Sequence, residues 1–192
     1  KAAVLEEQGD LDTDPTFGVQ QIAIIAWTSI STAKSNPDPG LLAIQNLRDL
    51  LARWLHDDAA FGDGGGYADP ASPVVYFDDL PNILMRAFES LAVVASESMQ
   101  HQNAAAIYRT FAGQFHRLPA PLRMQAEDLL LRSLSGLGDH ILTSELDAAL
   151  SDLCTALRAR GPSACAEALA DAQQRLARSV GRLHSRGTRA AP

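Results

Sequence analysis

A run of 18 uncharged residues, 16–33, most constrains what this chain can fold into. It follows Asp14 and Pro15, which together are typical of a helix start, because Asp accepts free backbone N–H groups and Pro has no N–H to lose. Apolar residues then recur with the helical period, namely Val19, Ile22, Ala23, Ala26, Trp27 and Ile30. Ile24 and Ile25 widen this stripe, so we expect a central helix that is covered on several sides.

This run is close to the shortest length that can span a membrane, about 18 residues. It contains several polar residues, however, among them Gln20, Gln21, Thr28, Ser29, Ser31 and Thr32. The strongly apolar part is therefore only about six residues long, too short to cross a bilayer. We interpret the run as a buried core helix.

The Asp-Pro signal recurs at Asp38 and Pro39, where we expect Asp38 to cap a second helix that packs antiparallel to the first. Helical periodicity returns at Asp79 and continues to about residue 185. Helix ends are expected at Gly136 and Gly138 and at the segment 160–162. Ser144 and Asp147 resemble a capping box at the start of another helix.

These patterns predict an all-α fold, a multi-helix bundle of about seven helices with at most one short extended segment, at residues 74–77. Residues 14–185 are expected to form a single helical domain. It would follow a linker at 1–13, contain a glycine-rich loop at 57–73, and end in a frayed tail at 186–192. Because the chain begins with Lys1 rather than Met, we expect it to be part of a longer protein.

The sequence shows no arrangement of residues that points to a reaction. None of the five histidines has metal-ligand spacing, no serine lies in a nucleophile elbow, and the loop 57–73 lacks the lysine of a nucleotide loop. We therefore predict no catalytic residue, no cofactor, no metal and no enzymatic activity. An enzyme would need a cleft that gathers histidines such as His101 and His116 with aspartates. Cys154 and Cys165 are interpreted as small buried hydrophobes, and a net charge of −7 does not favour nucleic acid as a partner.

Uncharged polar residues on the first two expected helices are the main candidates for a binding role: Gln20, Gln21, Gln45 and Asn46. They either hydrogen-bond to neighbouring loops or line a groove that a ligand or another domain enters. The candidate interaction surface combines two of them with the helix starts, and consists of Asp14, Phe17, Gln20, Gln21, Asn36 and Asp38.

The stretches DPTFGVQQIAIIAWTSIS and DPGLLAIQNLRDLL resemble a family of bacterial predicted membrane proteins of unknown function, DUF two-two-five-four. The clear likeness covers residues 10–55, and a looser one reaches about residue 135. The matching positions are Asp14, Pro15, Phe17, Gly18, Gln21, Ser31, Asp38, Pro39 and Ala43. Gln20 stands where the family has Arg, and Ile24 where it has Asp.

The resemblance implies several transmembrane helices ahead of residue 1, with this domain on the cytoplasmic face of the bacterial inner membrane. It implies no activity. The function that we expect is a protein-interaction or regulatory module, with the protein's own transmembrane region, other proteins or a second copy as partner. The alternative is a domain that senses an apolar small molecule in a cavity lined by Trp27, Trp54, Phe88 and Phe111.

Overall fold

The computed structural model describes residues 14–32, 36–61, 80–137 and 142–179. Within these ranges the chain forms seven α-helices and no strand, so the predicted all-α bundle is confirmed. The helices are α1 (Pro15–Thr32), α2 (Asp38–Phe61), α3 (Leu80–Glu97), α4 (His101–Gln114), α5 (Ala120–Leu137), α6 (Ser144–Arg158) and α7 (Ala164–Ser179). The expected extended segment 74–77, the linker 1–13 and the tail 186–192 lie outside the described residues.

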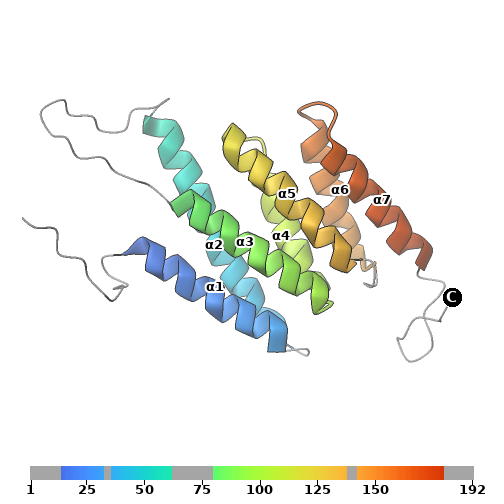
Figure 1. The fold of residues 1–192 in the computed structure, drawn as a ribbon, viewed down its shortest axis with the longest axis horizontal. Coiled ribbons are helices and arrows are strands. Elements are labelled where there is room, and N and C mark those ends of the chain that lie inside the picture. Colours follow the sequence, from blue (N-terminus) through green and yellow to red (C-terminus); the bar gives the residue numbers. More distant parts are fainter. Residues whose placement is uncertain (1–13, 33–35, 62–79, 138–141, 180–192) are drawn as a thin grey trace, which may run out of the picture.

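The helices are stacked in two layers (Figure 1). One layer contains α1, α3, α5 and α7, and each of these helices packs on the next one in that order. The other layer contains α2, α4 and α6, which are packed in the same way. Such stacking of helical hairpins is the arrangement of helical repeat proteins, in which each unit contacts mainly its neighbours. Consequently α1 and α7 lie at the two ends of one layer.

The hydrophobic core fills the space between the layers. Phe88 of α3 and Phe111 of α4 are completely buried, and their rings meet edge to face with centroids 5.4 Å apart. Leucines from α2, α3, α5, α6 and α7 complete this core. Burying a leucine or phenylalanine side chain contributes about 1.5–3 kcal/mol. The chain therefore has a continuous apolar interior that joins the two layers.

Two glycines allow neighbouring helices to approach closely. A Cβ at Gly40 of α2 would lie 2.8 Å from Cγ1 of Ile30 and 2.9 Å from Oδ1 of Asn103. A Cβ at Gly136 would lie 2.8 Å from Cβ of Ser96, on α3. Gly136 was predicted to end its helix, but it lies inside α5 and serves this contact instead. Gly138 lies outside the described residues.

Two predicted helix starts are wrong by one residue. The side chain of Asn36 accepts a hydrogen bond from the backbone N–H of Asp38 (3.2 Å), so α2 already begins at Asp38, which was predicted to be the cap. Thr143, rather than Ser144, caps α6 by accepting from the N–H of Leu146 (3.2 Å). At both sites a residue one or two positions earlier, Thr143 or Asn36, also carries a side-chain oxygen, and sequence alone does not decide which of two nearby oxygens caps the helix.

The predicted loop 57–73 begins later than expected. Helix α2 continues to Phe61, so residues 57–61 are helical. Asp57 and Asp58 were assigned to the loop because three glycines follow soon after them, but no breaker lies between them and Phe61. The remainder, residues 62–73, lies outside the described residues.

Candidate functional site

Helix α1 begins where the sequence predicts, because Asp14 caps it. The Oδ1 atom of Asp14 accepts hydrogen bonds from the backbone N–H groups of Thr16 (2.9 Å) and Phe17 (3.2 Å). Pro15 is the first helical residue. The carboxylate of Asp14 therefore has a structural role in fixing the start of α1.

The outward-facing side of α1 is apolar and exposed, so the prediction of a central helix covered on several sides is wrong. Val19, Ala26 and Ile30 are buried against the neighbouring helices. Ile24 and Ile25 are each 57% exposed, and Trp27 is 48% exposed. The reason is the position of α1 at the end of its layer, where α2 and α3 cover only one side of it.

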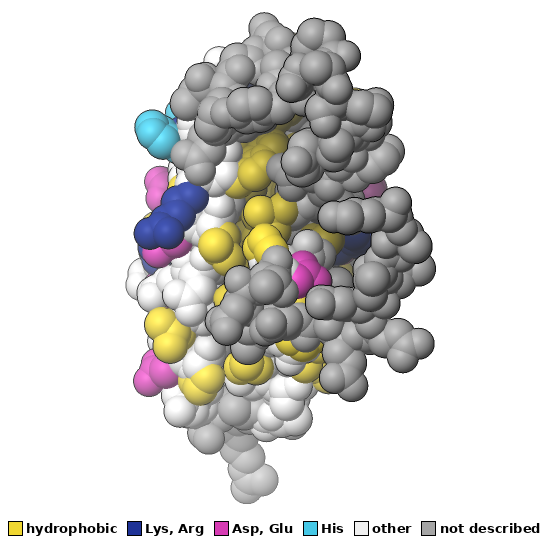
Figure 2. All heavy atoms as spheres, turned by 90° about the vertical axis from the view of Figure 1, so that its left-hand side faces the viewer, with side chains coloured by type: hydrophobic (Ala, Val, Ile, Leu, Met, Phe, Trp, Pro, Cys, Tyr) yellow, Lys and Arg dark blue, Asp and Glu magenta, His cyan; other side chains and the backbone are white. Residues whose placement is uncertain are grey.

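Figure 2 shows the end of the molecule to which α1 and α2 belong, where hydrophobic side chains gather in a band on the surface. Monomeric soluble proteins rarely expose large apolar patches, and such patches mark interaction sites. Helix α1 carries no charged residue from Pro15 to Thr32. The exposed face of α1, defined by Ile24, Ile25 and Trp27, is therefore the candidate functional site.

A groove runs between α1 and α3 beside this face. Its volume is about 340 Å³, and it is lined by Gln20, Ala23, Ile24, Ile83, Arg86, Ala87 and Ser90. The lining combines the small residues Ala23, Ala87 and Ser90 with the longer side chains of α1 and α3. A groove with a mostly apolar lining fits an aliphatic or aromatic side chain.

The six residues predicted as one interaction surface fall into two groups. Asp14 caps α1, and Phe17, Gln20 and Gln21 lie on its first two turns. Among these four only Gln20 is exposed, and it lines the groove. Asn36 and Asp38 lie at the start of α2, after the far end of α1. Because α1 continues from Gln21 to Thr32 and a helix rises about 1.5 Å per residue, roughly 16 Å of helix separates the groups. They do not form one continuous surface.

The sequence predicts a groove at Gln20 as one of two alternatives, but it does not identify the exposed isoleucines as part of a site. Ile24 and Ile25 were recognised only as a widening of the apolar stripe. The breadth of the apolar stripe on α1 was a usable signal. A stripe that runs nearly round a helix is buried only if neighbouring helices cover every side of it. Only the packing order of the helices reveals that α1 lacks a neighbour on its outer side.

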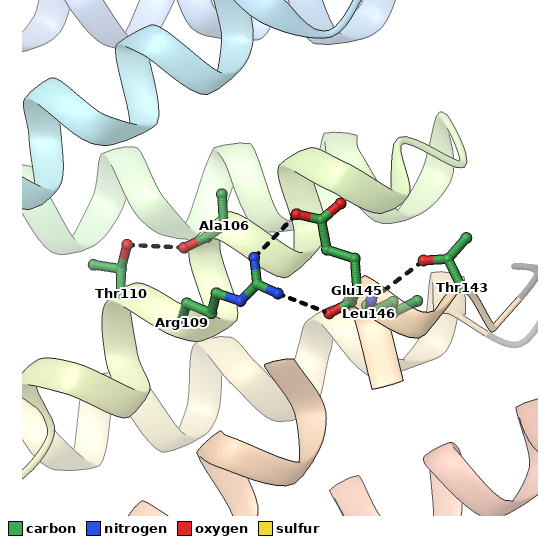
Figure 3. Close-up of polar contacts among 6 residues, drawn as sticks. All are labelled: Ala106, Arg109, Thr110, Thr143, Glu145 and Leu146. Atoms are coloured by element: carbon green, nitrogen blue, oxygen red, sulfur yellow. Dashed lines mark hydrogen bonds and ion pairs between the residues drawn. The ribbon is translucent and has the colours of Figure 1, made fainter. Parts of the chain in front are cut away.

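A second hollow, about 670 Å³ in volume, lies where α4 and α6 begin and is lined by Pro37, the segment 98–102 and the segment 143–145. Figure 3 shows that Arg109 of α4 reaches the first turn of α6. Arg109 donates from Nη1 to Oε1 of Glu145 (3.0 Å) and from Nη2 to the backbone oxygen of Glu145 (3.4 Å). The Glu145 carboxylate, which lines this hollow, is thus already paired with Arg109.

A third hollow, about 280 Å³ in volume, lies between α3 and α5 and is polar. Arg132 forms ion pairs there with Glu89 (2.7 Å) and with Asp128. These side chains are more than a third exposed, and surface ion pairs of this kind contribute little to stability. Of the three hollows described, only the groove between α1 and α3 adjoins an exposed apolar helix face.

The potential catalytic and metal-binding side chains are scattered over the described part of the chain. His56, His101 and His116 lie on α2, at the start of α4 and just after α4, while His140 and His184 lie outside the described residues. Within the described ranges no three His, Cys, Asp or Glu residues come together as a metal site. The described residues therefore offer no metal centre to which a reaction could be assigned.

Cys154 and Cys165 are free thiols buried between helices, as the sequence predicts. Burial raises the pKa of the Cys165 thiol to about 12, and the nearby Glu127 carboxylate adds to this effect. Burial also raises the pKa of Cys154. Because the thiolate is the reactive form of cysteine, the raised pKa values make both thiols poorly reactive.

The four aromatic residues expected to line a ligand cavity do not all come together. Phe88 and Phe111 contact each other in the core, whereas Trp27 is half-exposed on α1 and Trp54 packs at the edge of the core on α2. None of these four side chains lines any of the three hollows.

Comparisons with protein families, curated proteins and solved structures find no match to this chain. The likeness of residues 10–55 to the membrane-protein family therefore stays a prediction. Among the helices of the described ranges, none combines the length and the hydropathy needed to cross a bilayer.

Proposed function

We propose that the chain is a protein-interaction module that binds its partner through the exposed face of α1. The observation that carries this proposal is the exposure of Ile24, Ile25 and Trp27 on a helix without a charge. Covering about half of each of these side chains removes apolar surface from water, which favours association by about 25 cal/mol per Å² before the costs of binding. The adjoining groove supplies a pocket for an anchoring side chain from the partner.

The rigidity of the surrounding elements supports the same proposal. Ile30 and Val19 fix α1 to the core on its inner side, and the cap at Asp14 fixes its start. The exposed face is therefore presented by an ordered helix rather than by a loop. A preorganised helix face loses little conformational entropy when a partner binds it.

The cellular setting of the proposal comes from the family resemblance. In that setting the module lies on the cytoplasmic face of a bacterial inner membrane and regulates, or is regulated by, membrane-spanning helices of the same protein. Those helices, other proteins and a second copy of the chain are the partners available to it there.

Binding of an apolar small molecule is a second candidate, and one observation favours it. The groove between α1 and α3 has a volume of about 340 Å³ and a mostly apolar lining, which is the size of a small ligand site. Replacing Ala87 by Leu would fill this groove from α3. Loss of binding of an apolar fluorescent probe in Ala87→Leu, but not in Ile25→Ser, would favour the ligand over a protein partner.

Site-specific photo-crosslinking in cells tests the interaction module. A photoreactive amino acid is placed at Thr28, which is exposed on α1, and as a control at Arg175, which is exposed on α7. We expect a discrete crosslinked product from position 28 that disappears when Ile24→Lys is added. Equal products from both positions, or a product that survives Ile24→Lys, would overturn the proposal.

A further inference from the structure

The turns that join α4 to α5 and α6 to α7 lie at the same edge of the bundle, at the top of Figure 1. Arg160 of the second turn donates from Nη1 to the backbone oxygen of His116 in the first turn, over 2.7 Å. The fold thus brings together two short segments, 114–124 and 158–163. We call the surface that these two segments form the turn edge.

The turn edge is basic although the chain as a whole is acidic. Its two segments contain no aspartate or glutamate, whereas the whole chain has a net charge of −7. They contain four arginines, namely Arg117, Arg123, Arg158 and Arg160. All of these except Arg123 are exposed, and so is His116. The charge at this edge therefore has the sign opposite to that of the whole chain, and it would attract anions.

No carboxylate of the described residues forms an ion pair with any of these four arginines. Arg123 donates instead from Nη1 to the backbone oxygen of Leu118, over 2.7 Å, just as Arg160 donates to His116. Each of these contacts uses one of the five N–H donors of a guanidinium group. The backbone thus holds two of the arginines in place without neutralising their charge.

The type of basic residue at the turn edge favours phosphate as the anion. Its two segments contain arginine and no lysine. A guanidinium group is planar and presents its N–H donors as a fork that matches two oxygens of one phosphate. Because the arginines come from two turns, a surface that carries many phosphates can contact several of them at once.

The turn edge also exposes apolar side chains between its arginines. Met124 of α5 is 74% exposed, more than any other large apolar side chain of the described residues. Pro121 and Pro162 are exposed as well. Basic residues next to exposed apolar ones are typical of surfaces that lie on a membrane, where the charges meet lipid headgroups and the apolar groups enter the interface. Nucleic acid and soluble phosphates offer Met124 no such environment.

We propose that the turn edge binds the surface of a bilayer that contains anionic phospholipids. This inference goes beyond the proposed function, because it concerns a surface other than the exposed face of α1. In the bound state the arginines contact lipid phosphates, and Met124 lies at the boundary between headgroups and acyl chains. Because helix ends form the turn edge, the exposed face of α1, along the side of the bundle, stays accessible to its partner (Figure 1).

Screening by salt allows an acidic chain to bind an anionic surface through a basic edge. At physiological ionic strength, charges farther apart than about 8 Å interact weakly. The arginines that touch the membrane therefore determine the attraction, and the acidic residues elsewhere oppose it only weakly. Each arginine near an anionic surface strengthens binding by roughly 5-fold. Added salt should weaken the binding.

Co-sedimentation of the whole purified chain with lipid vesicles tests this inference. We expect binding to vesicles of equal parts phosphatidylcholine and phosphatidylglycerol, and at least ~10-fold weaker binding to phosphatidylcholine alone. Arg117→Gln combined with Arg158→Gln should weaken binding to the anionic vesicles by at least ~10-fold. Both side chains are exposed, and circular dichroism verifies that the variant is folded.

Arg175→Gln combined with Arg178→Gln is the matched control. It removes the same charge from exposed positions near the end of α7, away from the turn edge. It should therefore change vesicle binding by less than ~3-fold. An equal loss in the two double variants, or equal binding to both kinds of vesicle, would overturn the proposal.

Met124→Ser distinguishes a membrane from a soluble anion. It should weaken binding to the anionic vesicles by about 3-fold or more, and it should not change the binding of soluble polyphosphate. Vesicle binding that is unchanged in Met124→Ser would mean that the turn edge takes a soluble polyanion or an acidic protein, and the membrane proposal would be wrong.

Ile24→Ser keeps the two exposed surfaces of the chain apart in this experiment. Ile24 belongs to the exposed face of α1, so this variant should bind the anionic vesicles as the unaltered chain does. Loss of binding in Ile24→Ser, with binding retained when Arg117 and Arg158 are replaced, would assign membrane contact to α1 and refute the turn edge.

Discussion

At the scale of single residues, close contacts determine which positions tolerate change. Gly40 lies where α2 approaches both α1 and α4, and Asn103 lies against it, completely buried. Both side-chain amide atoms of Asn103 lack a hydrogen-bond partner among the described residues. Gly40 of α2 and Asn103 of α4 are thus in close contact, and the apolar periodicity of the sequence does not predict this contact.

Gly40→Ala should destabilise the chain although alanine is the better helix former. The added Cβ would lie 2.8 Å from Cγ1 of Ile30 and 2.9 Å from Oδ1 of Asn103, and both side chains are buried and confined. We expect a loss of about 1–3 kcal/mol in the free energy of unfolding, measured with urea. Gly113→Ala is the matched control, because a Cβ there meets nothing within 4 Å. It should stabilise the chain by about 0.5–1 kcal/mol, and a similar loss in both variants would contradict the close approach.

Tyr108 should make the chain sensitive to alkali. Burial raises the pKa of Tyr108 from 10.0 to about 12, against the lowering effect of its hydrogen bond to Ser133 (3.0 Å). A raised pKa in the folded state stabilises the protein fully below the unfolded pKa, and this contribution is lost as the pH rises through the folded pKa. The urea midpoint should therefore fall between pH 10 and pH 12.

Tyr108→Phe should make that fall shallower. The hydroxyl of Ser133 also donates to the backbone oxygen of Leu130 (2.7 Å), so it keeps a partner in the variant. Cys165, whose pKa is raised from 9.0 to about 12, accounts for part of the remaining decline. An identical pH profile for the two proteins would show that Tyr108 is not the buried titrating group.

At the scale of elements, the sequence predicts the helices better than their ends. The Asp14-Pro15 start is confirmed because capping and helix-start chemistry agree at adjacent positions. The starts of α2 and α6 were wrong by one residue because Asn36 and Thr143 offer an oxygen one or two residues earlier. Local hydrogen bonding of this kind depends on backbone geometry, which residue types alone do not specify.

Thr143→Ala tests the corrected start of α6. Thr143 accepts a hydrogen bond from the N–H of Leu146, so its loss should cost about 1 kcal/mol of unfolding free energy. Ser144 is exposed and follows the cap, and Ser144→Ala should change the stability by less than about 0.5 kcal/mol. The reverse ranking of the two variants would restore the capping box that was predicted at Ser144.

Alanine replacements along α1 test which side of that helix packs against the core. Ile30 is 1% exposed, so Ile30→Ala should cost about 2–5 kcal/mol in urea unfolding. Ile25 is 57% exposed, so Ile25→Ala should stay within about 0.5 kcal/mol at protein concentrations where the chain is monomeric. Equal losses from both replacements would indicate that α1 is enclosed on all sides.

At the scale of the whole molecule, the sequence does not predict the order in which the helices stack. Ile24, Ile25 and Val19 are all apolar residues of one helix, yet only Val19 is buried. Their periodicity predicts a helix with a broad apolar surface, and it does not say how many neighbours that helix has. The position of α1 at the end of a layer decides this, and that position depends on contacts between helices far apart in the sequence.

The candidate site therefore follows from the fold rather than from a motif. Gln20 was predicted as part of an interaction surface and does line the groove, whereas Asn36 and Asp38 lie at the other end of α1. The charged exposed side of α7 and the uncharged exposed side of α1 make the two ends of the described helical stack chemically different.

Fluorescence quenching of Trp27 tests most directly whether the α1 face is open. The chain has two tryptophans, so Trp54→Phe leaves Trp27 as the only one. Trp27 is 48% exposed, and we predict strong quenching by acrylamide in dilute solution that decreases when a partner covers the face. Weak quenching already in dilute solution would mean that the chain covers this face itself, and it would contradict both the open end and the interaction surface built on it.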